Sequence, residues 1–266
     1  VALLAPYNEE GFIQGCLEPM LAQGVSVYVI DNASTDGTRA IAQGYVGRGV
    51  IDVETLPRHG CYTWRPILER KERLAAELEG DWFLHLDADE IRLPPEPGTR
   101  LADALARVDA EGFNAVNFME FTFVPTRETP DHDHPRFAQT MRWYYPYLPS
   151  FPNRLNAWKR QDAPVELAWS GGHRVRFPGL KMYPVSFPMK HYLFLSADHA
   201  RRKYIERTYD AAEMSAGWHR ARAGLRPEGI RLQSEQEMRH CGADGRLDPT
   251  EPLKKHPLFA QIGHGS

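Results

Sequence analysis

The chain has 266 residues, which suits one elaborated domain, because a single hydrophobic core stops growing near roughly 250–300 residues. Apolar residues make up 42% of the chain and charged residues 25%, a balance that excludes disordered, collagen-like and coiled-coil proteins. The 32 Lys and Arg residues against 35 Asp and Glu residues give a net charge of −3, so we expect no nucleic-acid partner. No apolar run approaches the roughly 20 residues of a membrane helix.

The cysteines indicate the compartment. Cys16, Cys61 and Cys241 are odd in number, lie far apart and form no CxxC pair, which is typical of unpaired thiols in a reducing environment. No secretory leader opens the sequence. We therefore expect a cytoplasmic protein, and peripheral attachment to a membrane stays open.

Strand and helix patterns alternate through the first half of the chain. The predicted strands cover Val1–Ala5, Val25–Ile30, Val50–Leu56, Trp82–Leu86 and Asn114–Val124. The predicted helices cover Glu9–Leu21, Thr35–Gln43, Pro66–Glu79 and Gly98–Val108. This alternation predicts an α/β fold with a mostly parallel twisted sheet and helices on both faces.

The second half of the chain loses this rhythm. Residues 125–152 are rich in Pro, Tyr and His and are expected to form a long lid or binding loop. Short strands are predicted near Arg174–Phe177, Lys181–Tyr183 and Met189–Phe194, and the longest helix is predicted over Ala197–Ala223. The polar stretch after Gly224 reads as a peripheral C-terminal extension.

Polar residues follow three of the predicted strands. The clusters are Tyr7-Asn8-Glu9-Glu10, the segment from Asp31 to Thr38, and Asp87-Ala88-Asp89-Glu90. In an open α/β sheet, ligands bind beyond the carboxyl ends of the strands, so we expect these clusters to meet at one site. The Asp31–Thr38 segment alone could equally be a turn that caps a helix.

Asp87 and Asp89 are the most chemically specific pair. Two carboxylates two residues apart, just after a buried strand, repel each other, and a bound divalent cation removes that cost. Hard oxygen ligands suit Mg2+ or Mn2+, which keep open positions for water and a phosphate. The pair therefore predicts a metal site.

Other motifs are absent or less specific. The sequence holds no GxGxxG, P-loop, GxSxG or HExxH motif. Asp131-His132-Asp133-His134 lacks a further spaced ligand set, so a solvated or acceptor-facing loop is favoured over zinc. The aromatic run from Trp143 to Tyr147 is compatible either with sugar stacking or with local packing. For Arg70 and Lys71 a solvated helix face is favoured over the donor site.

The order of the three polar clusters resembles that of a family 2 glycosyltransferase with the GT-A fold. The branch it most resembles has an extended D-x-D-E motif and a later HY…S…K segment, here His191-Tyr192, Ser196 and Lys203. Gly171-Gly172-His173 also fits that branch. The resemblance spans roughly residues 1–204. It implies a GT-A-like domain over 1–223, with a nucleotide-binding half at 1–112, an acceptor-side half at 113–223 and an extension at 224–266.

The resemblance implies a role for each motif residue. Pro6, Asn8 and Glu9 would line the nucleotide pocket, and Asp31 would meet the base or ribose. Asp87 would lie near the ribose and metal, Asp89 would be the main metal ligand, and His191 would close the site near the metal or diphosphate. The residues assigned to catalysis are Asp89, Glu90 and Glu120. No Glu-Asp pair follows the fifth strand, so the base stays essentially unassigned. Glu120 is the nearest strand-end carboxylate, and it could equally be a buried strand residue. His173 is a candidate on the acceptor side.

The start of the last long helix gathers cations. Ser196 is predicted as its N-cap, and Lys190, His191, Arg201, Arg202 and Lys203 surround that end. Cations oppose the helix dipole there, so we expect an anion among them, with His191 and Lys203 toward the donor diphosphate. Side chains splayed into water are the alternative.

The expected function is metal-dependent transfer of a sugar from a nucleotide-diphosphate donor, expected to be UDP-linked, to an acceptor hydroxyl with inversion. One alternative is a nucleotidyltransferase or sugar-nucleotide pyrophosphorylase, although Ala5–Gly11 lacks the Gly-rich phosphate loop of that class. A catalytically silent binding module of the same fold is the other, and the presence of both Asp87 and Asp89 argues against it.

Overall fold

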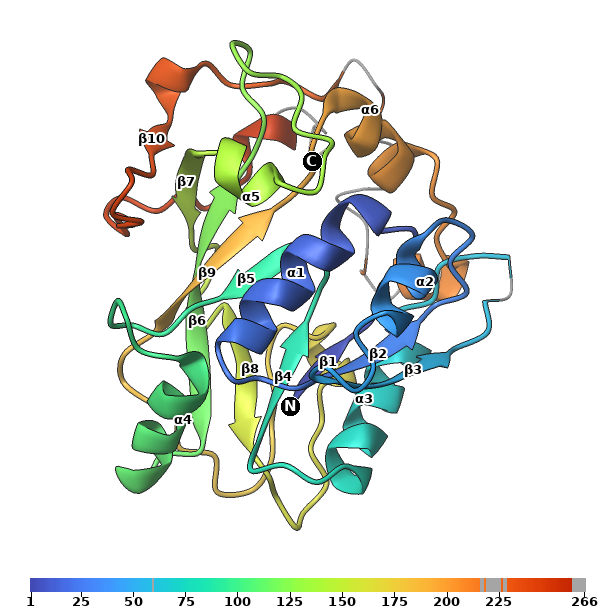
Figure 1. The fold of residues 1–266 in the computed structure, drawn as a ribbon, viewed down its shortest axis with the longest axis vertical. Helices are drawn as coiled ribbons and strands as arrows, with labels where there is room; N and C mark the ends of the chain where they lie inside the picture. Colours follow the sequence, from blue (N-terminus) through green and yellow to red (C-terminus); the bar gives the residue numbers. More distant parts are fainter. Residues whose placement is uncertain (59, 216–217, 219–225, 227–228, 260–266) are drawn as a thin grey trace.

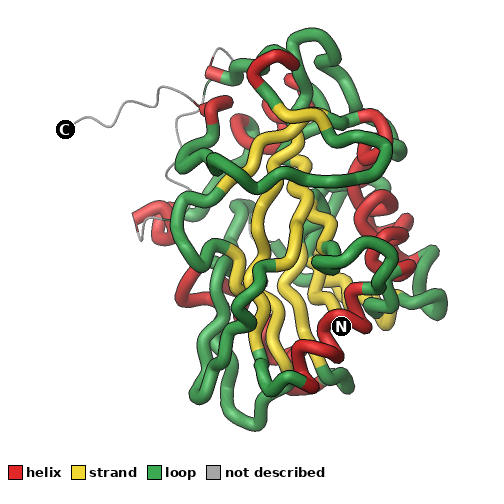
Figure 2. Tube along the Cα trace, turned by 90° about the vertical axis from the view of Figure 1, so that its left-hand side faces the viewer, coloured by secondary structure: helices red, strands yellow, loops and turns green. Residues whose placement is uncertain are grey.

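The computed structural model describes residues 1–58, 60–215, 218, 226 and 229–259 (Figure 1). Ten strands form one sheet, whose main path runs in the order β10-β7-β6-β8-β4-β1-β2-β3. Figure 2 shows the strands passing through the middle of the molecule. The mixed α/β class expected from the sequence is confirmed.

The N-terminal half of the sheet is parallel. β1 (Ala2–Leu4) lies between β2 (Val27–Asp31) and β4 (Trp82–Leu86), and β3 (Val50–Thr55) pairs with the outer side of β2. Every residue of β1, β2 and β4 is buried, as expected for parallel strands covered on both faces. Their carboxyl ends therefore share one edge, where the three polar clusters begin.

Helices cover both faces of this half. α1 (Glu10–Ala22) and α4 (Leu101–Ala110) pack on the face that carries Leu4 and Val29. α3 (Arg65–Glu77) packs on the opposite face, against Leu3 and Phe83. The short α2 (Thr38–Gln43) lies beside α1 and β3. The predicted layers are confirmed, with apolar residues of each helix turned to the sheet.

The C-terminal half of the sheet is mixed. β8 (Arg154–Lys159) joins β4 to β6 (Ala115–Phe123) and runs antiparallel to both. β7 (Trp143–Tyr147) is antiparallel to β6. β9 (Phe187–Tyr192) is parallel to β6 and antiparallel to the short β5 (Glu90–Arg92). Through β5, the segment that follows Asp89 is hydrogen-bonded to β9.

The region expected to be a long loop contains regular structure. α5 (Phe137–Thr140) and β7 both lie within residues 125–152, and the aromatic run is mostly packing, with Tyr144 buried against Phe123. β8 was missed by the sequence analysis. The two strands predicted at 174–177 and 181–183 are instead isolated bridges, which join Arg174 to Leu155 and Met182 to Ala115.

The predicted long helix is interrupted. α6 (Ala197–Ala200) continues as the π-helical turn η2 (Arg201–Ile205), and α7 (Ala211–Ser215) follows after a break. The N-cap prediction is confirmed, because the Ser196 side chain accepts a hydrogen bond from the His199 amide. At this break, the backbone amide of Tyr62 donates a hydrogen bond to the carbonyl of Thr208. Residues 216–217 and 219–223 of the predicted helix lie outside the described residues.

The described part of the C-terminal segment lies at the edge of the sheet. β10 (Arg239–His240) pairs with β7, and Leu258 in η5 (Pro257–Phe259) is buried beside Tyr145. Two further 3-10 turns are η1 (Ala168–Ser170) and η4 (Glu235–Glu237). None of the helices in the described parts of the chain is long and apolar enough to cross a membrane.

A buried ion pair on β5 gives a test of this packing. Arg92 Nη2 donates to Glu90 Oε2 at 2.6 Å, and both side chains are almost fully buried. Arg92→Met would leave the carboxylate of Glu90 buried without its cation, so we expect the free energy of unfolding to fall by about 3–5 kcal/mol in urea denaturation. The double variant with Glu90→Gln should lose less.

The matched control is Arg100→Met, which removes the exposed pair between Arg100 and Asp103. Solvent screens that pair, so its loss should change stability far less than the loss of Arg92. Equal effects of the two single variants would show that the buried pair on β5 does not hold the sheet together.

Candidate active site

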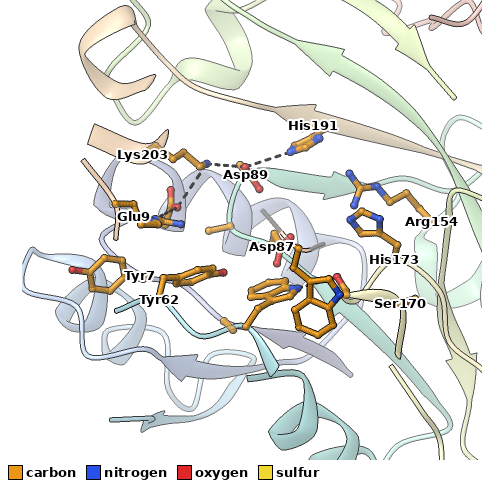
Figure 3. A pocket seen from close by; sticks show the side chains of 16 residues that line it. Tyr7, Glu9, Tyr62, Asp87, Asp89, Arg154, Ser170, His173, His191 and Lys203 are labelled. Carbon is orange, nitrogen blue, oxygen red and sulfur yellow. Dashed lines mark hydrogen bonds and ion pairs between the residues drawn. The ribbon is translucent and has the colours of Figure 1, made fainter. Parts of the chain in front are cut away.

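A pocket of about 370 Å3 lies beyond the carboxyl ends of β1 and β4 (Figure 3). Its charged lining comes from both halves of the molecule and consists of Glu9, Asp87, Asp89, Arg154, His191, Lys203 and Arg207. Aromatic side chains complete the walls, among them Tyr7, Tyr62 and Trp64. Two of the three predicted polar clusters therefore contribute to one pocket.

Asp89 contacts two other charged side chains of the pocket lining. Its Oδ2 accepts a hydrogen bond from Lys203 Nζ at 2.7 Å and lies 3.4 Å from His191 Nε2. Burial would raise the pKa of Asp89, but Lys203 and then His191 hold it well below its usual range. The structure thus brings together the three residues that the sequence placed near the donor diphosphate.

His191 is held between two carboxylates. Its Nδ1 lies 2.7 Å from Glu120 Oε1, and its Nε2 faces Asp89. Burial lowers the pKa of His191, but Glu120 and Asp89 outweigh it and raise the pKa to about 10. Both ring nitrogens of His191 thus contact carboxylates, and the ring bridges Asp89 and Glu120.

Glu120 and Glu90 lie beneath the pocket rather than in its lining. Glu120 is completely buried in β6, where Arg154 Nη2 approaches its Oε2 to 2.9 Å and His191 contacts its other oxygen. Burial would raise the pKa of Glu120, yet Arg154 and His191 lower it well below its usual range. Glu90 is paired with Arg92. In this structure each of these carboxylates is paired with a buried arginine, and neither lines the pocket.

Asp87 lines the pocket with a side chain that is 30% exposed. Behind it, His85 Nε2 lies 3.5 Å from Asp87 Oδ1, and Lys71 Nζ lies 3.0 Å from His85 Nδ1. Burial lowers the pKa of His85 to about 4 and that of Lys71 to about 8. Lys71 is thus a buried support of Asp87 and not part of a solvated face, whereas Arg70 pairs with Glu54 at the surface of α3.

The first two polar clusters are tied to each other. Asn8, at a φ of 53°, accepts a hydrogen bond from the Thr35 amide at 2.8 Å, and the carbonyl of Pro6 accepts one from the Asn32 amide. Asp31 Oδ2 accepts from the Ser34 amide at 3.1 Å. Asp31 Oδ1 is buried without a hydrogen-bond partner among the described residues. Pro6, Asn8 and Asp31 shape the loops beside the pocket, and Asp31 keeps one free acceptor.

Glu9 lies on the opposite side of the pocket from His173 (Figure 3). Its Oε1 is 3.6 Å from Lys203 Nζ and 3.8 Å from Arg207. Burial raises the pKa of Glu9 to about 7, and Lys203 opposes that shift. Arg207 also stacks on Tyr62 at 4.8 Å.

Arg58 stacks on Tyr7, with its guanidinium 3.7 Å from the ring centre. Neither Arg58 nor Arg207 was found from the sequence, since both belong to segments without a motif.

Of the five cations expected around the start of the long helix, some line the pocket and the others lie elsewhere. Only His191 and Lys203 line the pocket. Arg202 pairs with Asp133, Arg201 pairs with Glu206, and Lys190 lies against the ring of Phe123. Two of the five cations are therefore placed to contact an anion in the pocket.

His173 reaches the pocket from a tight turn after η1. Gly171 and Gly172 both have positive φ, 65° and 85°. Trp64 Nε1 donates to the carbonyl of Gly171 at 2.9 Å, and Asn156 Nδ2 donates to that of Gly172 at 3.2 Å. His173 is exposed and lines the pocket.

The Asp131–His134 segment does not form a zinc site. His132 Nδ1 and His134 Nε2 both contact the hydroxyl of Thr140, at 2.9 and 3.2 Å. Within the described ranges, no group of three or more His, Cys, Asp or Glu side chains is arranged to hold a metal ion by itself.

Comparison with known proteins gives three results. Residues 3–163, more than half of the chain, match the family model described as glycosyl transferase family 2. The lipopolysaccharide core biosynthesis glycosyltransferase LpsC of Rhizobium meliloti (strain 1021) is 30% identical over 109 residues, which cover 41% of this chain and 37% of LpsC. S. aureus TarS 1-349 in complex with UDP-GlcNAc is 15% identical with a TM-score of 0.40, covering 72% of this chain and 57% of that one. The chain thus spans well under two thirds of these proteins.

The turn before His173 can be tested through its glycines. A Cβ on Gly172 would lie 2.9 Å from the ring of His85, whereas a Cβ on Gly179, at a φ of 75°, meets nothing within 4 Å. Gly179→Ala should cost about 1–2 kcal/mol from backbone strain alone. Gly172→Ala should cost about 1–3 kcal/mol more, because of the added overlap. Thermal and urea unfolding of the two variants would measure the difference, and equal losses would show that the turn is not tightly packed.

Proposed function

Because this chain belongs to glycosyl transferase family 2, we propose that it transfers a sugar from a UDP-linked donor to an acceptor hydroxyl, with inversion at the anomeric carbon. The observation that carries the proposal is the contact of Lys203 and His191 with Asp89 in a pocket at the strand ends. The cations of this pocket can bind the charged phosphates of such a donor, and its carboxylates can accept hydrogen bonds from the donor's hydroxyls. The similarity to LpsC supports a saccharide as the acceptor.

We place the nucleoside near Tyr7, Glu9 and Asp31. Asp31 Oδ1 is a buried acceptor without a partner in the described structure, and an imide N–H or a ribose hydroxyl would satisfy it. Glu9 Oε2 is unpaired in the same way. Two unsatisfied acceptors beside one pocket favour a ligand rich in donors, as a nucleoside is.

A divalent cation, Mg2+ or Mn2+, fits the same pocket. Asp87 and Asp89 supply hard oxygen ligands, and both contacts of Asp89 use Oδ2, so its Oδ1 makes none among the described residues. Among the described residues, no third protein ligand joins Asp87 and Asp89. Mg2+ usually binds one or two protein carboxylates and takes its other ligands from water and substrate phosphates. When bound, the ion would stabilise the negative charge of the leaving diphosphate.

The chain's own residues divide the remaining work. Lys203 and His191 hold positive charge beside the place proposed for the diphosphate, where negative charge grows as the glycosidic bond breaks. Their carboxylate partners fix their positions before the donor arrives, so little reorganisation is needed. The acceptor oxygen attacks the face of the anomeric carbon opposite the diphosphate, which gives inversion.

The first test removes the central carboxylate. Asp89→Asn should nearly abolish UDP release from UDP-sugars, because it removes both the proposed metal ligand and the partner of Lys203. Excess EDTA should have the same effect on the wild type. Circular dichroism should show an unchanged fold, since the amide keeps the size of the side chain. Full activity of the variant, or of the wild type in EDTA, would contradict the proposal.

The second test concerns the nucleoside. Asp31→Ala removes the unpaired acceptor and should weaken UDP binding by about 1–3 kcal/mol, measured by calorimetry. Asp52→Ala is a suitable control, because Asp52 is exposed on β3, away from the pocket lining. If the Asp31 and Asp52 variants bind UDP with wild-type affinity, Asp31 is only a turn residue.

A further inference from the structure

We propose that His173 accepts the proton of the acceptor hydroxyl during sugar transfer. This inference rests on the proposed function and deepens it, because the expected carboxylate bases are engaged elsewhere. Glu120 and Glu90 are buried in pairs with Arg154 and Arg92. A base must lie within hydrogen-bond reach of the proton that it takes, so it must be sought among the side chains that line the pocket.

Three of the carboxylates in the lining have other partners. Asp89 is bonded to Lys203, and Glu9 lies near Lys203 and Arg207. Asp87 contacts His85 and belongs to the pair that we assign to the cation. The ring of His173 is open to the pocket, and in the described part of the chain it has no hydrogen-bond partner. Among the carboxylates and imidazoles of the lining, it is the one without a hydrogen bond or ion pair to another described side chain.

The turn that carries His173 is built to aim it. Two consecutive residues with positive φ suit glycine alone, and Gly172 lies so close to His85 that a methyl group would overlap the ring. Trp64 and Asn156 hold the carbonyls of these glycines from two different elements. Such a turn, fixed from several sides, holds the backbone of His173 in one place and so limits where its imidazole can lie.

The position of His173 relative to the donor site fits this role. Figure 3 shows it beside Arg154, across the pocket from Glu9 and Lys203. A neutral imidazole carries a hydrogen on one ring nitrogen and a lone pair on the other, so the ring of His173 has a nitrogen that can accept a proton. We place the sugar and the acceptor in the part of the pocket between His173 and the contacting residues Asp89, His191 and Lys203.

The step balances as a single displacement. The acceptor oxygen forms a bond to the anomeric carbon while its proton moves to the imidazole of His173. The bond between that carbon and the diphosphate oxygen breaks, and the diphosphate leaves with the electron pair. The imidazolium then releases its proton to water, so no further reactant is required.

The test uses UDP release from UDP-glucose, UDP-galactose and UDP-N-acetylglucosamine, with water or simple sugars as the acceptor, beside calorimetry with UDP. His173→Ala and His173→Asn should each lower the release of UDP about 100-fold or more, while the dissociation constant for UDP stays within about twofold of the wild type. Added imidazole should restore part of the activity of His173→Ala, because the small molecule can take the vacated place. His134→Ala, outside the pocket, should keep wild-type activity and show no response to imidazole.

The outcomes separate the two proposals. A wild type that neither binds UDP nor releases it from any donor would overturn the proposed function, and the role of His173 with it. An active wild type with equally active His173 variants would overturn the role of His173 alone. Loss of UDP binding in both variants, without rescue by imidazole, would make His173 a structural residue and would also overturn the inference.

Discussion

The site depends on the need to neutralise carboxylates that the fold buries. A chain of contacts runs from Lys203 through Asp89, His191 and Glu120 to Arg154. Each buried carboxylate in this chain has a cation on at least one side. Removing one member would leave a charge uncompensated at low dielectric, which costs far more than an exposed pair contributes. The residues around the pocket are therefore constrained as a group.

This chain of ion pairs explains why the parallel half of the sheet is followed by a mixed half. β4 delivers Asp87 and Asp89 at its carboxyl end, but the cations that they need come from β8, β9 and the π-helical turn η2. β5 turns back immediately after Asp89 and pairs with β9, which sets Glu90 opposite His191. The parallel strands thus place carboxylates at this edge of the sheet, and the strands of the mixed half bring cations to the same edge. Interruptions such as a π-turn are frequent at functional sites.

The sequence allowed the parallel half to be predicted, because its strands are continuous apolar runs and its polar clusters follow them directly. It did not reveal β8, whose inward residues Arg154 and Asn156 are polar and resemble a loop. Arg154 is acceptable inside only because Glu120 meets it across the sheet, and Asn156 because it binds the carbonyl of Gly172. Such pairs depend on strand register, which a single sequence does not disclose. The pairing of Glu120 with Arg154 depends on the same register. Lys71 was assigned to a solvated helix face, whereas it contacts His85 and the carbonyl of Leu86 where α3 packs on β4.

The balance of charge in the site bears on how a donor would bind. The pocket lining holds the carboxylates of Glu9, Asp87 and Asp89, and Glu120 lies behind it. Four cations line the same pocket, on Arg154, His191, Lys203 and Arg207. A diphosphate entering such a pocket brings negative charge that the existing cations already share with carboxylates. A divalent cation held by Asp87 and Asp89, as we propose, would offset that charge, and the diphosphate would supply oxygens to the cation. On this proposal the donor and the cation would each strengthen the binding of the other by the same factor.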